Sequence, residues 1–153
     1  MTSPAFDVIK RLQGRTLATA ESCTGGGIGA ALTQVSGASA VYKGGIVSYC
    51  NEIKQKLLSV PGELLDQYGA VSASVARSMA QGARAVLDAD IAVSVTGLAG
   101  PTGDEFGNPV GTVFIGYADE HRCLSREFHF TGNREEVRAK AVDSALKLIV
   151  ELA

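Results

Sequence analysis

Thr16-Leu-Ala-Thr-Ala-Glu-Ser-Cys-Thr-Gly-Gly-Gly27 is the stretch from which the fold can be worked out. Its apolar and β-branched residues give way to hydroxyl-bearing residues and three glycines, which predicts a strand over residues 16–21 that runs into a turn. The mostly apolar residues 28–35 then predict a helix. At this junction the glycines let a ligand approach the backbone N–H groups, and the helix N-terminus favours the negative charge of a phosphate or an oxyanion. The alternative is that Ser22 or Thr24 simply caps the helix.

The rest of the chain also alternates helical and strand patterns, which predicts an α/β fold. A short turn at 119–122 joins the last two strands as a hairpin, so one strand runs antiparallel to the others and the sheet is mixed. Asn51 is the expected N-cap of one helix, and Asn133 with Glu136 resembles a capping box for the final helix. Further helices are expected over 4–13, 51–58 and 63–68, from Ser72 or Ser74 to 88, and from 134 onward. Further strands are expected within 41–49 and over 91–96, 112–118 and 124–130.

Composition bounds the class of protein. The 153 residues are 46% hydrophobic, which suits one globular domain over residues 1–153. Fourteen basic residues stand against sixteen acidic ones and form no cluster, so we expect neither nucleic acid nor a membrane as partner, but a small molecule. Three widely spaced cysteines argue against a disulfide framework or structural zinc. With no leader pattern and no membrane-length apolar run, we expect a cytoplasmic protein.

Polar residues gather where three strands end: Ser22 and Thr24, then residues 48–54, then the Gly- and Pro-rich residues 96–111. The crevice beyond the carboxyl ends of strands is the usual ligand site in α/β sheets, so these segments are expected to converge there. Neither histidine belongs to a triad or metal motif, so if Ser22 is a nucleophile its base is another residue. Lys54 is the candidate, provided that burial lowers its pKa. The alternative is an exposed helix lysine.

Other motifs are weaker evidence of function. Gly25-Gly-Gly-Ile-Gly-Ala30 matches the dinucleotide fingerprint, but no acidic residue ends the next strand, so a dinucleotide oxidoreductase ranks third among the functions considered. Ser144-Ala-Leu-Lys147 matches Ser-x-x-Lys deep in a helix, and we interpret it as chance. Arg134 and Arg138 oppose the dipole of the last helix, which fits either solvated surface side chains or a bound anion.

Six stretches together resemble the C-terminal domain of the CinA proteins, whose stand-alone members include bacterial nicotinamide mononucleotide deamidases. They occur in the family's order over nearly the whole chain and read Ala20-Glu-Ser-Cys-Thr-Gly-Gly26, Gly44-Gly-Ile-Val-Ser-Tyr-Cys-Asn-Glu-Ile-Lys54, Gly69-Ala-Val-Ser72, Thr96-Gly-Leu-Ala-Gly-Pro101, Pro109-Val-Gly-Thr112 and Gly132-Asn-Arg-Glu-Glu-Val-Arg138.

The resemblance implies a three-layer α/β/α sandwich with a mixed, mostly parallel sheet of about five strands. It also implies a metal- and cofactor-independent amidohydrolase that converts nicotinamide mononucleotide to nicotinate mononucleotide and ammonia, in pyridine nucleotide salvage. Ser22 would be the nucleophile, Lys54 the base, and Tyr49 an orienting or relay group. The oxyanion would lie on backbone N–H groups of Thr24, Gly25 and Gly26.

The implied phosphate contacts come from residues 97–103, or from Arg134 and Arg138 by charge. With Thr96, Gly97 and Gly100, these complete the expected substrate site. The family usually has lysine and aspartate where this chain has Asn108 and Asn133. Asn108 weakens a phosphate role for its loop, and Asn133 cannot pair with Arg134 as a carboxylate would.

A non-catalytic nucleotide-binding module, linked to competence or DNA-damage responses by the family's name, is the alternative function. We also expect a homo-oligomer, with a dimer as the first choice.

Overall fold

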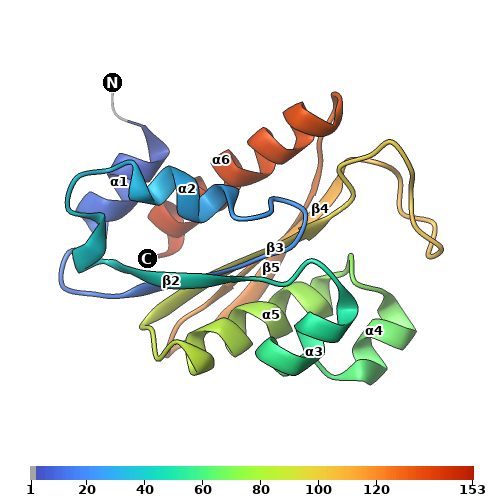
Figure 1. Ribbon diagram of the computed structural model, residues 1–153, viewed down its shortest axis with the longest axis horizontal. Coiled ribbons are helices and arrows are strands. Elements are labelled where there is room, and N and C mark those ends of the chain that lie inside the picture. Colours follow the sequence, from blue (N-terminus) through green and yellow to red (C-terminus); the bar gives the residue numbers. More distant parts are fainter. Residues whose placement is uncertain (1–2) are drawn as a thin grey trace.

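The structure is a computed structural model that describes residues 3–153 (Figure 1). Residues 1 and 2, at the start of the segment searched for a leader, lie outside the described residues. The elements in chain order are α1 (Pro4–Arg11), β1 (Leu17–Glu21), α2 (Gly27–Thr33), the 3₁₀ turn η1 (Ala38–Ala40), β2 (Tyr42–Val47), α3 (Asn51–Leu58), α4 (Gly62–Tyr68), α5 (Ala73–Val86), β3 (Ile91–Gly97), β4 (Thr112–Ala118), β5 (Cys123–His129) and α6 (Arg134–Leu152).

The five strands form one sheet in the order β2-β1-β3-β4-β5. β1 pairs in parallel with β2 on one side and with β3 on the other. β4 is antiparallel to both β3 and β5, so it alone runs against the other four strands. The prediction of a mixed, mostly parallel sheet with one antiparallel hairpin strand is confirmed.

Helices cover both faces of this sheet, which confirms the three-layer sandwich. α1, α2 and α6 lie on one face, and α3, α4 and α5 lie on the other (Figure 1). Alternate residues of β1 serve the two cores, because successive side chains of a strand point to opposite faces. Leu17 packs with the α1, α2 and α6 side, whereas Ala18 and Ala20 pack with the α3, α4 and α5 side.

Element boundaries differ from the sequence prediction at a few points. The helix expected over 28–35 ends at Thr33, and η1, which was not predicted, follows it. Asn51 is the first residue of α3, and Cys50, in extended conformation, occupies the N-cap position instead. The predicted capping box is confirmed, since the Asn133 side chain accepts from the Glu136 N–H and the Glu136 side chain accepts from the Asn133 N–H.

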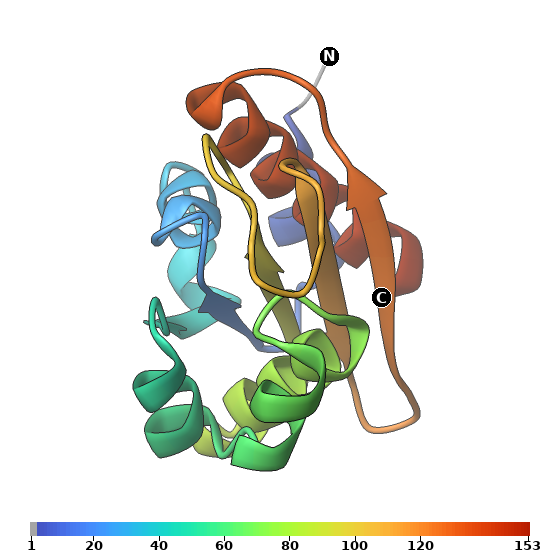
Figure 2. The ribbon, with the colours of Figure 1, turned by 90° about the vertical axis from the view of Figure 1, so that its right-hand side faces the viewer.

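The carboxyl ends of β1, β2 and β3 meet at one edge of the sheet, which Figure 2 views end on. The long segment from Leu98 to Gly111 lies over this edge, between the start of α6 and the α4 region. The predicted convergence of three strand ends is therefore found in the fold. Across residues 3–153, none of the helices combines the length and the hydropathy that spanning a membrane requires.

Candidate active site

Ser22 and Lys54 meet in the interior although 32 residues separate them. Lys54 Nζ lies 3.0 Å from Ser22 Oγ and donates to the Ser48 carbonyl oxygen at 2.8 Å. Lys54 is 1% exposed and Ser22 is 8% exposed. The alternative of a solvent-exposed helix lysine is thus wrong.

Backbone contacts between the ends of β1 and β2 hold this pair together. The Ser48 N–H donates to the Glu21 carbonyl oxygen at 2.8 Å, and the Ser22 N–H donates to Val95 on β3 at 3.0 Å. Ser48 is thereby fixed beside the end of β1, and its own carbonyl oxygen accepts a hydrogen bond from the Lys54 amine. The result is a closed ring of contacts through Glu21, Ser48, Lys54 and Ser22.

The surroundings of Lys54 favour its neutral form. Burial lowers the pKa of Lys54 below its ordinary value of 10.5, because a charged ammonium loses its hydration there. Among the described residues, no carboxylate forms an ion pair with it. The neighbouring thiol is poorly suited to be the nucleophile, since burial raises the pKa of Cys23 to about 11. The pair is therefore an alcohol beside an amine that releases its proton readily.

Glu21 organises the turn that carries Ser22, and the sequence reasoning missed it. Its carboxylate is 2% exposed and accepts from the Thr24 hydroxyl at 2.6 Å and from the N–H groups of Ile28 and Gly29 at 2.9 and 3.0 Å. The expectation that the start of α2 is open to a ligand anion is therefore wrong, because the chain's own carboxylate occupies it. The capping alternative is also wrong, since the N-cap is Gly26. An acidic residue ending an otherwise apolar strand was the available signal.

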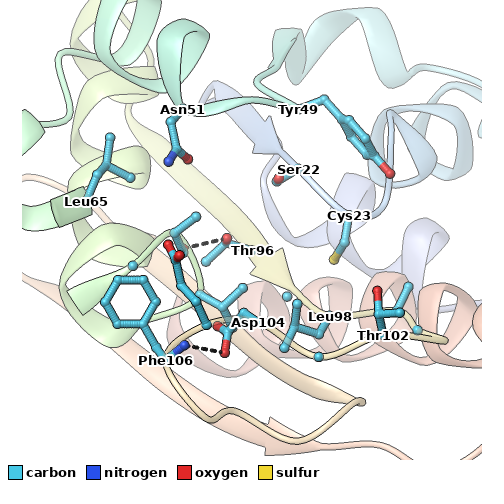
Figure 3. A pocket seen from close by; sticks show the side chains of 18 of the residues that line it. Ser22, Cys23, Tyr49, Asn51, Leu65, Thr96, Leu98, Thr102, Asp104 and Phe106 are labelled. Carbon is cyan, nitrogen blue, oxygen red and sulfur yellow. Dashed lines mark hydrogen bonds between the residues drawn. The ribbon is translucent and has the colours of Figure 1, made fainter. Parts of the chain in front are cut away.

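A cavity of about 480 Å³ opens beside the pair. Figure 3 shows Ser22 and Tyr49 on one wall and Phe106 and Asp104, from the long loop, on the opposite wall, with Thr96 between them. Of the predicted site residues, the lining includes Ser22, Tyr49, Lys54, Thr96, Gly97, Gly100 and Arg134. The predicted loop 97–103 also contributes Leu98, Ala99, Thr102 and Gly103. Residues not named for the site line it as well: Cys23, Asn51, Leu65, Gly69, Ala70, Val71, Asp104, Glu105 and Phe106.

Arg134 lines the cavity beside Tyr49. Its guanidinium donates to the Gly100 carbonyl oxygen at 2.6 Å and to the Tyr49 hydroxyl at 2.9 Å. The contact links the long loop to the end of β2, and Tyr49 is otherwise 60% exposed. Arg134 is exposed, as expected of a surface arginine, and its guanidinium is at the same time held by these two hydrogen bonds.

The structure does not place Thr24, Gly25, Gly26 or Arg138 among the side chains lining the cavity. The Thr24 side chain is buried on Glu21. The φ angles of Gly25 and Gly26 are +59° and +103°, so glycine is required for this turn. Arg138 is an exposed residue, and its guanidinium donates to the carbonyl oxygens of Cys23 at 3.0 Å and Thr24 at 3.2 Å.

Asn108 fastens the long loop instead of facing a ligand. Its side-chain amide donates to the Asp104 carboxylate at 2.8 Å and to the Val71 carbonyl oxygen at 3.2 Å. The Asp104 carboxylate also accepts the N–H groups of Phe106 and Asn108. The ring of Phe106 packs against Gly69, where a side chain would overlap it. These contacts hold the loop against the segment before α5 and shape the far wall of the cavity.

The described residues contain no group of three or more His, Cys, Asp or Glu side chains arranged to hold a metal ion. The fold and the site together define a three-layer α/β/α protein with a buried serine–lysine pair at the carboxyl edge of a mixed sheet. The sequence profile of the CinA C-terminal domain matches residues 3–153. The chain therefore belongs to the CinA C-terminal domain family.

Individual relatives agree with this assignment. A CinA-like protein of Geobacter sp. (strain M21) is 49% identical over 139 residues, covering 91% of this chain and 34% of the relative. One from Synechococcus sp. (strain RCC307) is 49% identical over 151 residues, covering 96% of this chain and 36% of that relative. The chain thus spans about a third of the length of these relatives.

Solved structures cover the chain more completely. A competence-damaged protein (CinA) superfamily protein from Escherichia coli superposes with a TM-score of 0.96 at 38% identity, covering 98% of this chain and 88% of that one. The competence/damage inducible protein CihA from Agrobacterium tumefaciens superposes with a TM-score of 0.91 at 37% identity, covering 99% of this chain and 97% of that one. The fold is therefore that of CinA superfamily proteins along nearly its whole length.

Proposed function

We propose that this domain is a Ser/Lys amidohydrolase that converts nicotinamide mononucleotide to nicotinate mononucleotide and ammonia. The observation that carries the proposal is the 3.0 Å contact between Lys54 Nζ and Ser22 Oγ, made where the amine is 1% exposed. A buried amine within hydrogen-bond distance of a hydroxyl is the arrangement that activates a serine without histidine. The substrate comes from the family resemblance and from the size and charge of the cavity.

In the proposed mechanism, Ser22 Oγ attacks the amide carbon while neutral Lys54 takes the hydroxyl proton. The Ser48 carbonyl oxygen accepts one amine hydrogen and so aims the lone pair of Lys54 at Ser22. The Gly25 N–H of the Thr24–Gly26 turn donates to the Ser22 carbonyl oxygen, so the N–H groups of Thr24 and Gly26 are the ones that stabilise the negative charge that develops on the amide oxygen. Lys54 then gives the proton to the leaving nitrogen, which departs as ammonia. Water activated by the same amine hydrolyses the acyl-serine and restores the pair.

The charges around the cavity suit the rest of a nucleotide. Arg134 supplies the cation at the mouth and would receive the phosphate, for which a guanidinium offers paired donors. Asp104 and Glu105 lie on the long loop, where carboxylates favour a cationic pyridinium ring or hydroxyl donors of a ribose. Tyr49 is placed to orient the substrate through its contact with Arg134.

The test is release of ammonia from nicotinamide mononucleotide by the purified protein in the presence of a chelator. Ser22→Ala and Lys54→Met should each lower the turnover by at least about a thousandfold, since each removes a member of a pair that acts as a unit. Lys56→Met is the matched control, because Lys56 lies on the same helix but is exposed. Wild-type protein without turnover, or pair variants at full activity, contradict the proposal.

The non-catalytic module predicts a different outcome of the same experiment. Calorimetry would then show binding of the nucleotide to the wild-type protein without any product, and Ser22→Ala would bind equally well.

We further propose a cytoplasmic homodimer. Light scattering tests the assembly, and thiol titration in the native protein tests whether the cysteines remain reduced, as in the structure.

A further inference from the structure

Arg138 reaches from the second turn of α6 to the turn that carries Ser22. Its Nε donates to the Cys23 carbonyl oxygen at 3.0 Å, and its Nη2 donates to the Thr24 carbonyl oxygen at 3.2 Å. The guanidinium also lies against Gly25, since a Cβ there would stand 3.4 Å from Nη2. One cation therefore donates hydrogen bonds to the carbonyl oxygens of two successive peptide units, Cys23–Thr24 and Thr24–Gly25.

This grip determines where the Thr24 N–H points. The Cys23–Thr24 peptide is trans, and in a trans peptide the C=O and the N–H point in opposite directions. Because Arg138 draws the Cys23 carbonyl toward α6, the Thr24 N–H points away from α6. Within residues 3–153 this N–H makes no hydrogen bond, whereas those of Gly25 and Gly27 are bound to carbonyls of the turn. An N–H two residues after the nucleophile is thus held in one orientation and left without an acceptor.

A charged donor on the carbonyl also strengthens the N–H of the same peptide. Hydrogen bonds in a chain polarise one another, and those with an ionised donor are the stronger ones. The Arg138 guanidinium withdraws electron density from the Cys23–Thr24 amide and so makes the Thr24 N–H a better donor to an oxyanion. The cation acts without touching the substrate.

We propose that Arg138 is a positioning residue that orients and polarises the Cys23–Thr24 peptide, so that the Thr24 N–H serves as the oxyanion donor for attack by Ser22. This inference rests on the proposed function only in that Ser22 is the nucleophile. It replaces the expectation that Arg138 binds the substrate phosphate directly. The two roles predict different kinetics, since a phosphate contact acts on substrate binding and an oxyanion contact acts on the transition state.

Two measurements on Arg138→Gln and Arg138→Lys test the proposal. The first is the steady-state rate of ammonia release from nicotinamide mononucleotide. The second is the rate at which a fluorophosphonate labels Ser22: the Ser22 oxygen bonds to phosphorus, fluoride leaves, and Lys54 takes the proton. This labelling needs the nucleophile and the oxyanion donor but not the natural amide. Lys140→Gln is the matched control, because it removes an exposed cation from α6 whose amine donates to the Thr131 carbonyl oxygen.

Arg138→Gln should lower kcat and the labelling rate together by about tenfold to a hundredfold, somewhat less than outright loss of an oxyanion donor, with KM changed less than about threefold. Arg138→Lys should recover only part of the rate, because an ammonium cannot hold both carbonyls in the same geometry. Lys140→Gln should match the wild type. Circular dichroism melts check that each variant is folded at the assay temperature.

The proposal is overturned if the labelling rate of Arg138→Gln equals that of the wild type, if KM rises while kcat stays constant, or if Lys140→Gln shows the same loss. It is also overturned if the fluorophosphonate fails to label Ser22 in the wild type. Labelling that depends on Arg138, in a protein that releases no ammonia from the mononucleotide, supports the positioning role and refutes the proposed substrate.

Discussion

Replacing Glu21 by glutamine should destabilise the protein although the side chain keeps its size. The carboxylate accepts three hydrogen bonds, from the Thr24 hydroxyl and from the N–H groups of Ile28 and Gly29. A glutamine has one oxygen, which can replace the carboxylate oxygen that serves Thr24 and Ile28. Its amide NH₂ then faces the Gly29 N–H, so two donors oppose each other at the start of α2.

The size of the effect follows from these contacts. Hydrogen bonds to a charged group contribute about 1.5–3 kcal/mol each and neutral ones about 1 kcal/mol, so the two retained bonds weaken by about 1–4 kcal/mol together. An unsatisfied Gly29 N–H costs a further 1–3 kcal/mol, roughly. Burying an uncharged amide in place of a carboxylate offsets part of this loss. The expected net loss is about 2–3 kcal/mol in the free energy of unfolding.

Urea unfolding at pH 7, followed by far-ultraviolet circular dichroism, measures this loss. The midpoint should fall with an unchanged slope, and the melting temperature should fall by roughly 4–12 °C for a domain of this size. Glu63→Gln, an exposed carboxylate in the first turn of α4, is the control and should shift stability by less than about 0.5 kcal/mol. A Glu21→Gln protein within 0.5 kcal/mol of the wild type would refute the role assigned to this carboxylate.

Three further predictions concern other parts of the molecule. Burial lowers the pKa of Lys54, so the unfolded chain holds the Lys54 proton to higher pH than the folded chain does. Wild type should therefore gain stability relative to Lys54→Met as pH rises from the lowered pKa toward 10.5. A difference in urea midpoints that does not change with pH contradicts this. Gly82→Ala should destabilise the protein by more than about 2 kcal/mol in thermal melts, because the added Cβ would overlap the Leu58 carbonyl oxygen. This loss opposes the higher helix propensity of alanine. A more stable variant would show that α3 and α5 can separate. Partial burial alone would raise the pKa of Asp119, but hydrogen bonds that include the Tyr117 hydroxyl lower it overall. Asp119→Asn should therefore cost about 1 kcal/mol at pH 7 and progressively less as pH falls below the ordinary value of 3.8, which pH-dependent unfolding tests.

The architecture was predictable because its determinants are local in sequence. The strands within residues 16–21 and 91–97 are buried along nearly their whole length because helices cover both faces of the sheet. The hairpin follows from two strands joined by a short turn. The N-cap of α3 was not predictable in this way, since Cys50 occupies it through its extended backbone without any side-chain hydrogen bond.

The closeness of Ser22 and Lys54 was predictable for a geometric reason, and the contacts that support the pair were not. Ser22 and Lys54 both follow the carboxyl ends of parallel strands that are neighbours, so proximity could be expected from their order. Glu21 turns its carboxylate back onto the backbone of α2, which no spacing rule indicates. Arg138 finds its carbonyl partners 114 and 115 residues away, and a sequence pattern that suggested solvent or an anion carries no information about such contacts.

α6 carries Arg134 to the cavity mouth and, one helical turn later, Arg138 to the back of the nucleophile turn. One helix thus connects the residue proposed to receive the phosphate to the residue proposed to position the turn after Ser22. Any tilt or axial shift of α6 moves both guanidinium groups at once, so moving the helix cannot change the position of one without the other. Alterations along the buried face of α6, far from the chemistry, would consequently register in substrate capture and in turnover together.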